Sequence, residues 1–180
     1  MFSGRLSVLL DGEAWRAKFR DFQSEAWRLE TLPAYNVPHE AEGVRAFQAG
    51  DRIDPRTHSN DYTEDLKRVR REGKTKGRVH IVTRPLSEYL RYEFMYYRPH
   101  VWAGEDIRIM DVTDRANPLN GVQDFWMFDK AEVVLMHYEP DGTQISREVY
   151  EGDVSPYIEY QRIALAESVP FEEYVKGLDV

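Results

Sequence analysis

Three short apolar segments in the last third of the chain, separated by turn signals, constrain the fold most strongly. Residues 125–128 and 132–138 flank a polar Asp-Lys pair, and Pro140-Asp141-Gly142 precedes a third segment at 143–150. Pro and Asp favour the early positions of a β-turn, and Gly tolerates the positive φ that such turns need. The pattern predicts an antiparallel meander whose central strand, 132–138, is apolar on both faces, and it predicts positive φ at Gly142.

Helical and strand periodicities predict the remaining elements. Apolar residues three and four apart predict helices over 11–30, 38–48, 61–72, 85–97 and 155–168, and further strands are predicted at 79–83 and 106–112. We expect Ser155 to cap the last helix and Trp126 to be mostly buried. The sequence therefore predicts one α+β domain over residues 1–180. It has a mostly antiparallel sheet of four to five strands, two or three helices before the sheet, and a closing helix.

Composition excludes several classes of function. The net charge of −8 disfavours wrapping of nucleic acid and binding to an anionic membrane, and no apolar run is long enough to span one. The chain has no cysteine, which excludes thiolate chemistry and suits a cytoplasmic protein. It also lacks a dinucleotide fingerprint, a nucleophile elbow, a calcium loop and an H-E-x-x-H motif. We therefore expect no cofactor and no metal.

A basic segment at residues 67–78 stands out against the acidic chain. Its seven cations and single acid give a local charge of +6, against −14 for the rest. Such a patch favours an acidic protein surface, or phosphates, as a partner. The alternative is a solvated helix end packed near acidic neighbours. The candidate contact residues, which we expect to be exposed, are Arg70, Arg71, Lys74 and Lys76.

A second set of residues could support metal-free cleavage of RNA. Such a reaction needs cations that stabilise the phosphorane and a general acid or base. Arg91 and Arg108, with Arg84 and Tyr89, could supply charge and hydroxyl groups, and Glu105 or Asp106 could act as base. The alternative is an amphipathic helix with tyrosines on the core. Acids at the predicted strand ends are further candidates for Mg²⁺, but they more often hold backbone amides: Glu105, Asp106, Asp124 and Asp129. His80 and His137 are expected to be hydrogen-bonded structural residues.

Four runs along the chain resemble one known family, the actinobacterial domain of unknown function 6879. They are residues 26–30 (AWRLE) with Tyr35 and Glu40, 85–93 (PLSEYLRYE), 103–108 (AGEDIR) and 124–129 (DFWMFD). The resemblance implies a cytosolic protein often encoded beside helix-turn-helix regulators, and it supplies no catalytic residue. The charged residues of these runs could orient helices on the sheet, an interpretation we favour, or line a ligand cleft.

Three functions follow from these observations. The first is a non-enzymatic regulatory module that binds a protein partner, such as a DNA-binding regulator. The second is a small ribonuclease-like effector, which a concave site gathering Arg91, Glu105 and Arg108 would favour. The third and weakest is a ligand-sensing pocket lined by Trp126 and tyrosines.

Overall fold

The computed structural model describes residues 8–178 and folds them around one eight-stranded sheet. The strand order is β1-β7-β6-β5-β2-β3-β4-β8, with only β2–β3 and β3–β4 parallel. The sheet is thus mostly antiparallel, as predicted, but it has more than the expected four or five strands. The strands are β1 (Val8–Leu9), β2 (Glu25–Glu30), β3 (Thr75–Val82), β4 (Asp106–Asp111), β5 (Phe125–Phe128), β6 (Glu132–Tyr138), β7 (Gln144–Val149) and β8 (Val169–Pro170).

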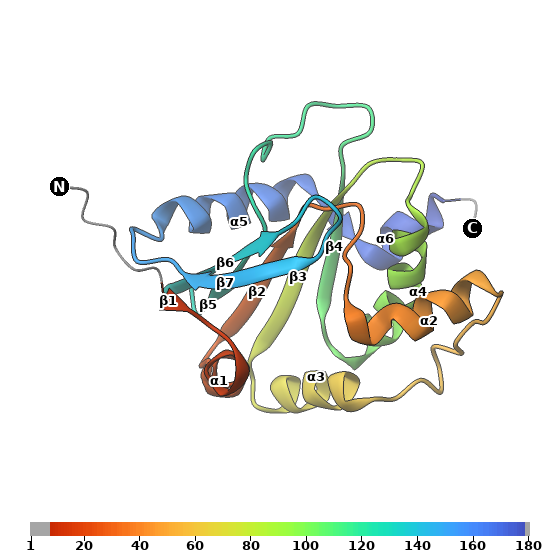
Figure 1. Cartoon of the computed structure of the whole chain (residues 1–180), viewed down its shortest axis with the longest axis horizontal. Coiled ribbons are helices and arrows are strands. Elements are labelled where there is room, and N and C mark those ends of the chain that lie inside the picture. Colours follow the sequence, from red (N-terminus) through yellow and green to blue (C-terminus); the bar gives the residue numbers. More distant parts are fainter. Residues whose placement is uncertain (1–7, 179–180) are drawn as a thin grey trace.

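Helices cover both faces of this sheet (Figure 1). They are α1 (Gly12–Asp21), the 3-10 turn η1 (Pro38–Glu40), α2 (Ala41–Gln48), α3 (Asp61–Arg71), α4 (Glu88–Ala103), α5 (Ser155–Glu167) and α6 (Phe171–Lys176). Helix α5 packs on one face, whereas α1, α3 and α4 contribute to the apolar clusters of the other. No helix in residues 8–178 is both long and apolar enough to cross a membrane.

The two faces of the central strands differ in chemistry because side chains alternate along a strand. Toward α5, strands β2 and β3 present Trp27, Leu29, Val79 and Ile81 to the main apolar core. Toward α3 and α4, the same strands present two triplets in which every residue except Ala26 is charged or polar. These are Ala26, Arg28 and Glu30 on β2, and Lys76, Arg78 and His80 on β3. A polar layer therefore lies at the centre of the fold, where a doubly covered sheet is usually apolar.

The elements with strong local signals are confirmed. Strands β5, β6 and β7 form the predicted meander, and Gly142 has φ +85°. Helix α3 begins at the Asn60 cap, whose side chain accepts a hydrogen bond from the Thr63 amide. Trp126 is buried, as expected.

The predicted helix over residues 11–30 is wrong in its second half. The helix ends at Asp21, and residues 25–30 form β2 between β3 and β5. The Asp129 carboxylate accepts hydrogen bonds from the amides of Gln23, Ser24 and Glu25, so the chain turns there. The apolar residues of this segment satisfied a helical period, and strand pairing far along the chain overrode it.

Smaller corrections concern where elements begin and end. Strand β3 begins at Thr75, four residues before the predicted start, and α4 continues to Ala103. Strand β8 and helix α6 follow α5 although no sequence signal predicted them. Ser155 does not cap α5; instead its amide and hydroxyl donate to Asp153. The helices expected ahead of the sheet are interleaved with its strands.

The β6–β7 turn gives a direct test of the fold. A Cβ added at Gly142 would overlap the carbonyl oxygen of Ala34, whereas a Cβ at Gly121 would meet nothing, although Gly121 has nearly the same φ of +84°. Both Gly→Ala substitutions impose the cost of positive φ, and only G142A adds a clash. We expect G142A to lower the free energy of unfolding by at least about 1 kcal/mol more than G121A does, measured by urea denaturation. Equal losses would contradict the close packing of this turn against Ala34.

Candidate functional site

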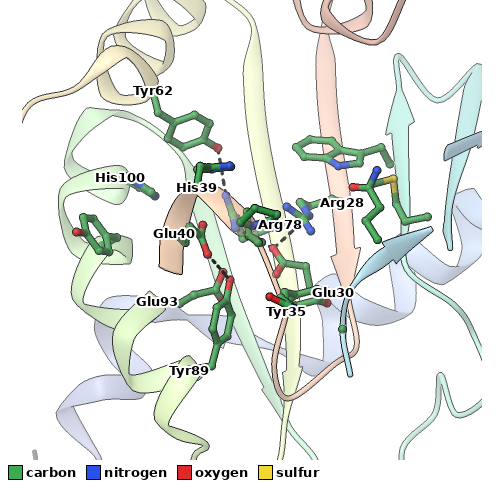
Figure 2. Close-up of a pocket in the computed structure, with 18 of the residues that line it drawn as sticks. Arg28, Glu30, Tyr35, His39, Glu40, Tyr62, Arg78, Tyr89, Glu93 and His100 are labelled. Carbon is green, nitrogen blue, oxygen red and sulfur yellow. Dashed lines mark hydrogen bonds and ion pairs between the residues drawn. The ribbon is translucent and has the colours of Figure 1, made fainter. Parts of the chain in front are cut away.

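A cavity of about 1040 Å³ opens over the polar layer, between the sheet and helices α1, α3 and α4. Figure 2 shows Arg28, Glu30 and Arg78 rising from the central strands, with Tyr62 on α3 and Tyr89 and Glu93 on α4 facing them. The base of the cavity is formed by side chains of β2 and β3. The pairing register of these strands places Arg28 opposite Arg78 and Glu30 opposite His80. The cavity therefore joins side chains from segments far apart in the sequence.

Arg78 is a fully engaged cation. Its Nε donates to Glu105 at 2.7 Å, one terminal nitrogen to Glu30 at 2.8 Å, and the other to the Tyr62 hydroxyl at 3.1 Å. Only 8 % of the Arg78 side chain is exposed, and both carboxylates are buried. Burial alone would lower the pKa of Arg78, but the adjacent carboxylates raise it well above its usual value. Each of the three Arg78 nitrogens thus donates to a protein acceptor, and these contacts tie β2, β3, α3 and the start of β4 together.

Arg28 is the opposite case. Its Nε lies 3.1 Å from Glu30, and its guanidinium carbon lies 5.1 Å from the centroid of the Trp126 ring. Within residues 8–178 it has no geometrically satisfactory hydrogen bond, and 19 % of its side chain is open to the cavity. Burial alone would lower the pKa of Arg28, but Glu30 raises it, so the group stays charged. Arg28 is therefore a largely buried cation whose N–H groups lack hydrogen-bond acceptors among residues 8–178.

Lys76 forms a second cationic point on the cavity wall. Its Nζ lies 4.4 Å from the ring centroid of Tyr62, 4.9 Å from Phe19 and 5.8 Å from Trp126. The Asp65 carboxylate is 3.8 Å away. Burial lowers the pKa of Lys76 to about 8, while nearby carboxylates oppose the shift. The rings therefore replace part of the hydration that this ammonium loses.

A chain of hydrogen bonds at the base of the cavity holds a proton on Glu93. His80 Nε2 lies 3.0 Å from the Leu32 carbonyl, so this nitrogen must donate, and Nδ1 of the neutral ring then accepts from the Tyr97 hydroxyl at 2.9 Å. The Tyr97 oxygen lies 3.1 Å from Glu93. Burial lowers the pKa of His80 and so favours its neutral ring; the Tyr97 proton is then directed to His80, and Glu93 supplies the proton between the two oxygens. Burial and then the nearby Glu30 charge raise the pKa of Glu93. Burial would likewise raise the pKa of Glu30, but Arg28 and Arg78 lower it.

Glu30, His80 and Glu93 also place three metal-ligand atoms within 4.8 Å of one another. Their present bonds do not suit a cation. Both His80 nitrogens are occupied, Arg78 lies against Glu30, and Glu93 carries the proton. These three residues are better described as part of a hydrogen-bond network at the base of the cavity than as a metal centre.

The cavity is also rich in hydroxyl and carboxyl groups. The Tyr89 hydroxyl donates to Glu40 at 2.8 Å (Figure 2). Tyr35 bonds the buried Asp124, which also accepts from the Thr31 amide. The cavity thus combines cations, aromatic walls and hydrogen-bonding groups.

The structure does not bring Arg91, Glu105 and Arg108 together. Glu105 lies beneath Arg78, Arg91 lines a separate cavity, and Arg108 bonds Ser168 on the opposite face of the sheet. The predicted concave ribonuclease site around these three residues therefore does not form.

The basic segment is also arranged differently from the expectation. Arg70 and Arg71 are exposed, but Lys74 is only 17 % exposed and Lys76 is buried in the aromatic wall. The expected exposure of Lys76 is therefore wrong, because β3 begins earlier than predicted and turns this side chain inward. Three cations of the segment have acidic partners close by in the sequence: Lys67 pairs with Glu64, Arg68 with Asp65 and Glu72, and Lys74 with Glu72.

The other candidate sets separate in the same way. Asp129 and Asp124 hold backbone amides, as the alternative interpretation predicted, and Asp106 lies on the α5 face of β4. His80 and His137 are hydrogen-bonded, His137 to Glu148 at 2.8 Å. Of the other candidates for RNA cleavage, Tyr89 lines the cavity of Figure 2, whereas Arg84 and Arg91 line the separate one.

The sequence analysis missed the residues that complete the site, namely Tyr62, Tyr97, His100 and Arg78 in the cavity lining, and His80 buried beneath it. One signal could have found them. Residues 27–30 and 78–81 both alternate polar and apolar side chains at period two. Two strands with charged residues on one face predict a polar layer, but the helical assignment of 11–30 hid the first of them.

A comparison with protein families matches residues 13–176 to the family described as "Domain of unknown function (DUF6879)". The match spans most of the chain, which therefore belongs to this family. No curated protein matches the chain. The family description names no activity, so the roles of the cavity residues must be argued from their geometry.

The Arg78 contacts predict a large stability effect. Arg78→Met should lower the free energy of unfolding by about 3–5 kcal/mol, because it leaves Glu105 buried without its charged partner. Adding Glu105→Gln to R78M should recover part of this loss, since it removes the stranded charge. Denaturant unfolding of the three proteins measures both effects, and a neutral R78M would contradict the structural role of this arginine.

The proton on Glu93 predicts a pH dependence of stability. The folded protein raises the pKa of Glu93 from 4.5 to about 8, so folding takes up a proton between these values. Stability should then fall as pH rises through this window, by at most about 1.4 kcal/mol per pH unit. Glu93→Gln mimics the protonated side chain. Its free energy of unfolding should equal that of the wild type near pH 5 and exceed it near pH 8. Parallel stability curves from pH 5 to 8.5 would show that Glu93 is already ionised.

Proposed function

We propose that this member of the DUF6879 family binds a small, ring-containing organic anion in the cavity and works as a ligand-responsive regulatory module. Arg28 is the observation that carries the proposal. A buried guanidinium normally finds acceptors for its nitrogens, and all three nitrogens of Arg78 beside it donate a hydrogen bond. Arg28 instead faces an open cavity with one ion pair. A ligand carboxylate or phosphate would complete its hydrogen bonds.

The surroundings of Arg28 support a ligand with a ring. The Trp126 ring lies within 6 Å of both Arg28 and Lys76, so an anion near this ring would meet two cations. Tyr35, Tyr62 and Tyr89 supply further flat walls. Apolar walls with a few converging polar groups are typical of small-molecule sites, which usually measure about 300–1,000 Å³.

The hydroxyl and carboxyl groups of the cavity support a ligand that also carries hydroxyl or amino groups. Glu40 and the Tyr89 hydroxyl, which η1 and α4 contribute to the cavity, can accept hydrogen bonds from such groups. A ligand of this kind would have its anion at Arg28 and its polar substituents toward α4. Regulation of a protein partner, such as a helix-turn-helix regulator, is part of the same proposal and is suggested by the family resemblance.

One observation favours a second candidate, metal-free cleavage of a phosphodiester. Glu93 holds a proton in a cavity that also contains two cations, which are the elements of acid catalysis. Binding is favoured over cleavage because the Glu93 proton is directed into the Tyr97–His80 chain instead of toward the open cavity.

The test compares charged probes with their neutral counterparts. AMP and benzoate should raise the melting temperature of the wild type more than adenosine and benzamide do, because only the anions can accept charge-assisted hydrogen bonds from the Arg28 guanidinium. Arg28→Met should abolish the difference. Glu30 keeps Arg78 as a partner in this variant, so the melting temperature without probe should stay equal or rise.

Arg45→Met is the matched control, since Arg45 is exposed on α2 and lines neither cavity. Equal shifts from charged and neutral probes, or full retention of the shifts in R28M, would contradict the proposal. Cleavage of single-stranded RNA that is present in the wild type and lost in E93Q would establish the second candidate in its place.

A further inference from the structure

A second cavity, of about 790 Å³, lies between α4, α6 and the loop after α2. It shares no lining residue with the cavity of Figure 2. Its apolar lining includes Phe47, Ile53, Leu86, Phe94, Met95 and Val175, all of which are half-buried. Partly exposed hydrophobic side chains gathered in one groove mark an interaction site more often than isolated ones do.

The charged residues lining this groove have a single sign. They are Arg52, Arg84, Arg91 and Arg98, and no acidic side chain lines the groove among residues 8–178. Arg84 and Arg98 have ion-pair partners, Asp111 and Asp114 for the first and Glu172 for the second. Arg52 and Arg91 are exposed and have no carboxylate partner in that part of the chain. On a protein of net charge −8, this is a local concentration of unneutralised positive charge.

Helix α4 gives the groove a defined spacing. Arg91, Phe94, Met95 and Arg98 occur at positions i, i+3, i+4 and i+7, so they form one stripe along the helix. The stripe is about 10 Å long at 1.5 Å per residue, with two apolar side chains between two cations. A second helix packed along this stripe is most complementary to it if it carries two apolar residues in the middle and an acidic residue about one turn away on each side.

We propose that this groove docks an acidic amphipathic helix of a protein partner. Apolar side chains of that helix would fill the space over Phe94 and Met95, and its acids would pair with Arg91, Arg52 and their neighbours. Four arginines spread around the groove suit several acids along a segment better than the single anion of a small ligand. This inference is independent of the ligand cavity.

The probe is a fluorescein-labelled, alanine- and glutamine-based helical peptide with Glu at i and i+7 and Leu at i+3 and i+4. We expect it to bind the wild-type protein in fluorescence anisotropy, more weakly as salt rises. Replacing both Leu by Ala, or both Glu by Lys, should abolish binding. Arg52→Ser with Arg91→Ser should weaken it by about tenfold, since neither cation has a carboxylate partner among residues 8–178.

Arg70→Ser with Arg71→Ser is the matched control, because it removes two exposed arginines from the basic segment and leaves the groove intact. Binding to this variant should stay within about twofold of the wild type. Circular dichroism checks that both variants are folded.

Three results would overturn the inference. These are no binding of the probe up to about 1 mM, an equal loss in R70S/R71S, and binding of decanoate in the groove without binding of the peptide. The second result would move docking to the basic segment, and the third would assign the groove to a small amphiphile. None of them affects the test of Arg28, which uses the other cavity.

Discussion

The buried contacts of Arg78 are the constraint on which the rest of the structure depends. One guanidinium joins Glu30 on β2, Glu105 at the start of β4 and Tyr62 on α3. Burying three charges costs more than an apolar core would, so this arrangement is not explained by stability alone. What it provides is position. It keeps α3 and α4 from closing onto β2 and β3, and the cavity exists because this layer is polar.

Local signals predicted the parts of the fold that local chemistry determines. The meander follows from turn residues and apolar runs, and α3 follows from its Asn60 cap and its charge order. Strand β2 was not predicted, because both of the strands that pair with it, β3 and β5, come from distant segments of the sequence. Strand β8 and helix α6 were not predicted, because both elements are too short to show a periodic pattern of apolar residues. Non-local pairing therefore accounts for the main errors in the fold prediction.

The candidate site was predicted only in fragments, for a related reason. Arg28, Glu30, Glu93 and Glu105 belong to the runs that carry the family resemblance, and they do form a charge network around the cavity. Sequence spacing could not show that Arg78 and His80 complete it, because strand register decides this. The basic segment shows the same limit. Its charges could be counted, but most are neutralised by acids one turn away or turned inward.

Helix α4 separates the two cavities, which explains its unusual sequence. Tyr89, Tyr92 and Glu93 line the first cavity, whereas Arg91, Phe94 and Arg98 line the second, so no side of the helix is simply solvated. A helix used on both sides cannot show the single apolar stripe of a surface helix. This sharing also sets the condition for regulation. Events in one cavity can change binding in the other only if α4 occupies two positions that the two partners prefer differently. The residue after its cap, Glu105, is held by Arg78, so such a shift would have to strain or reform that buried ion pair.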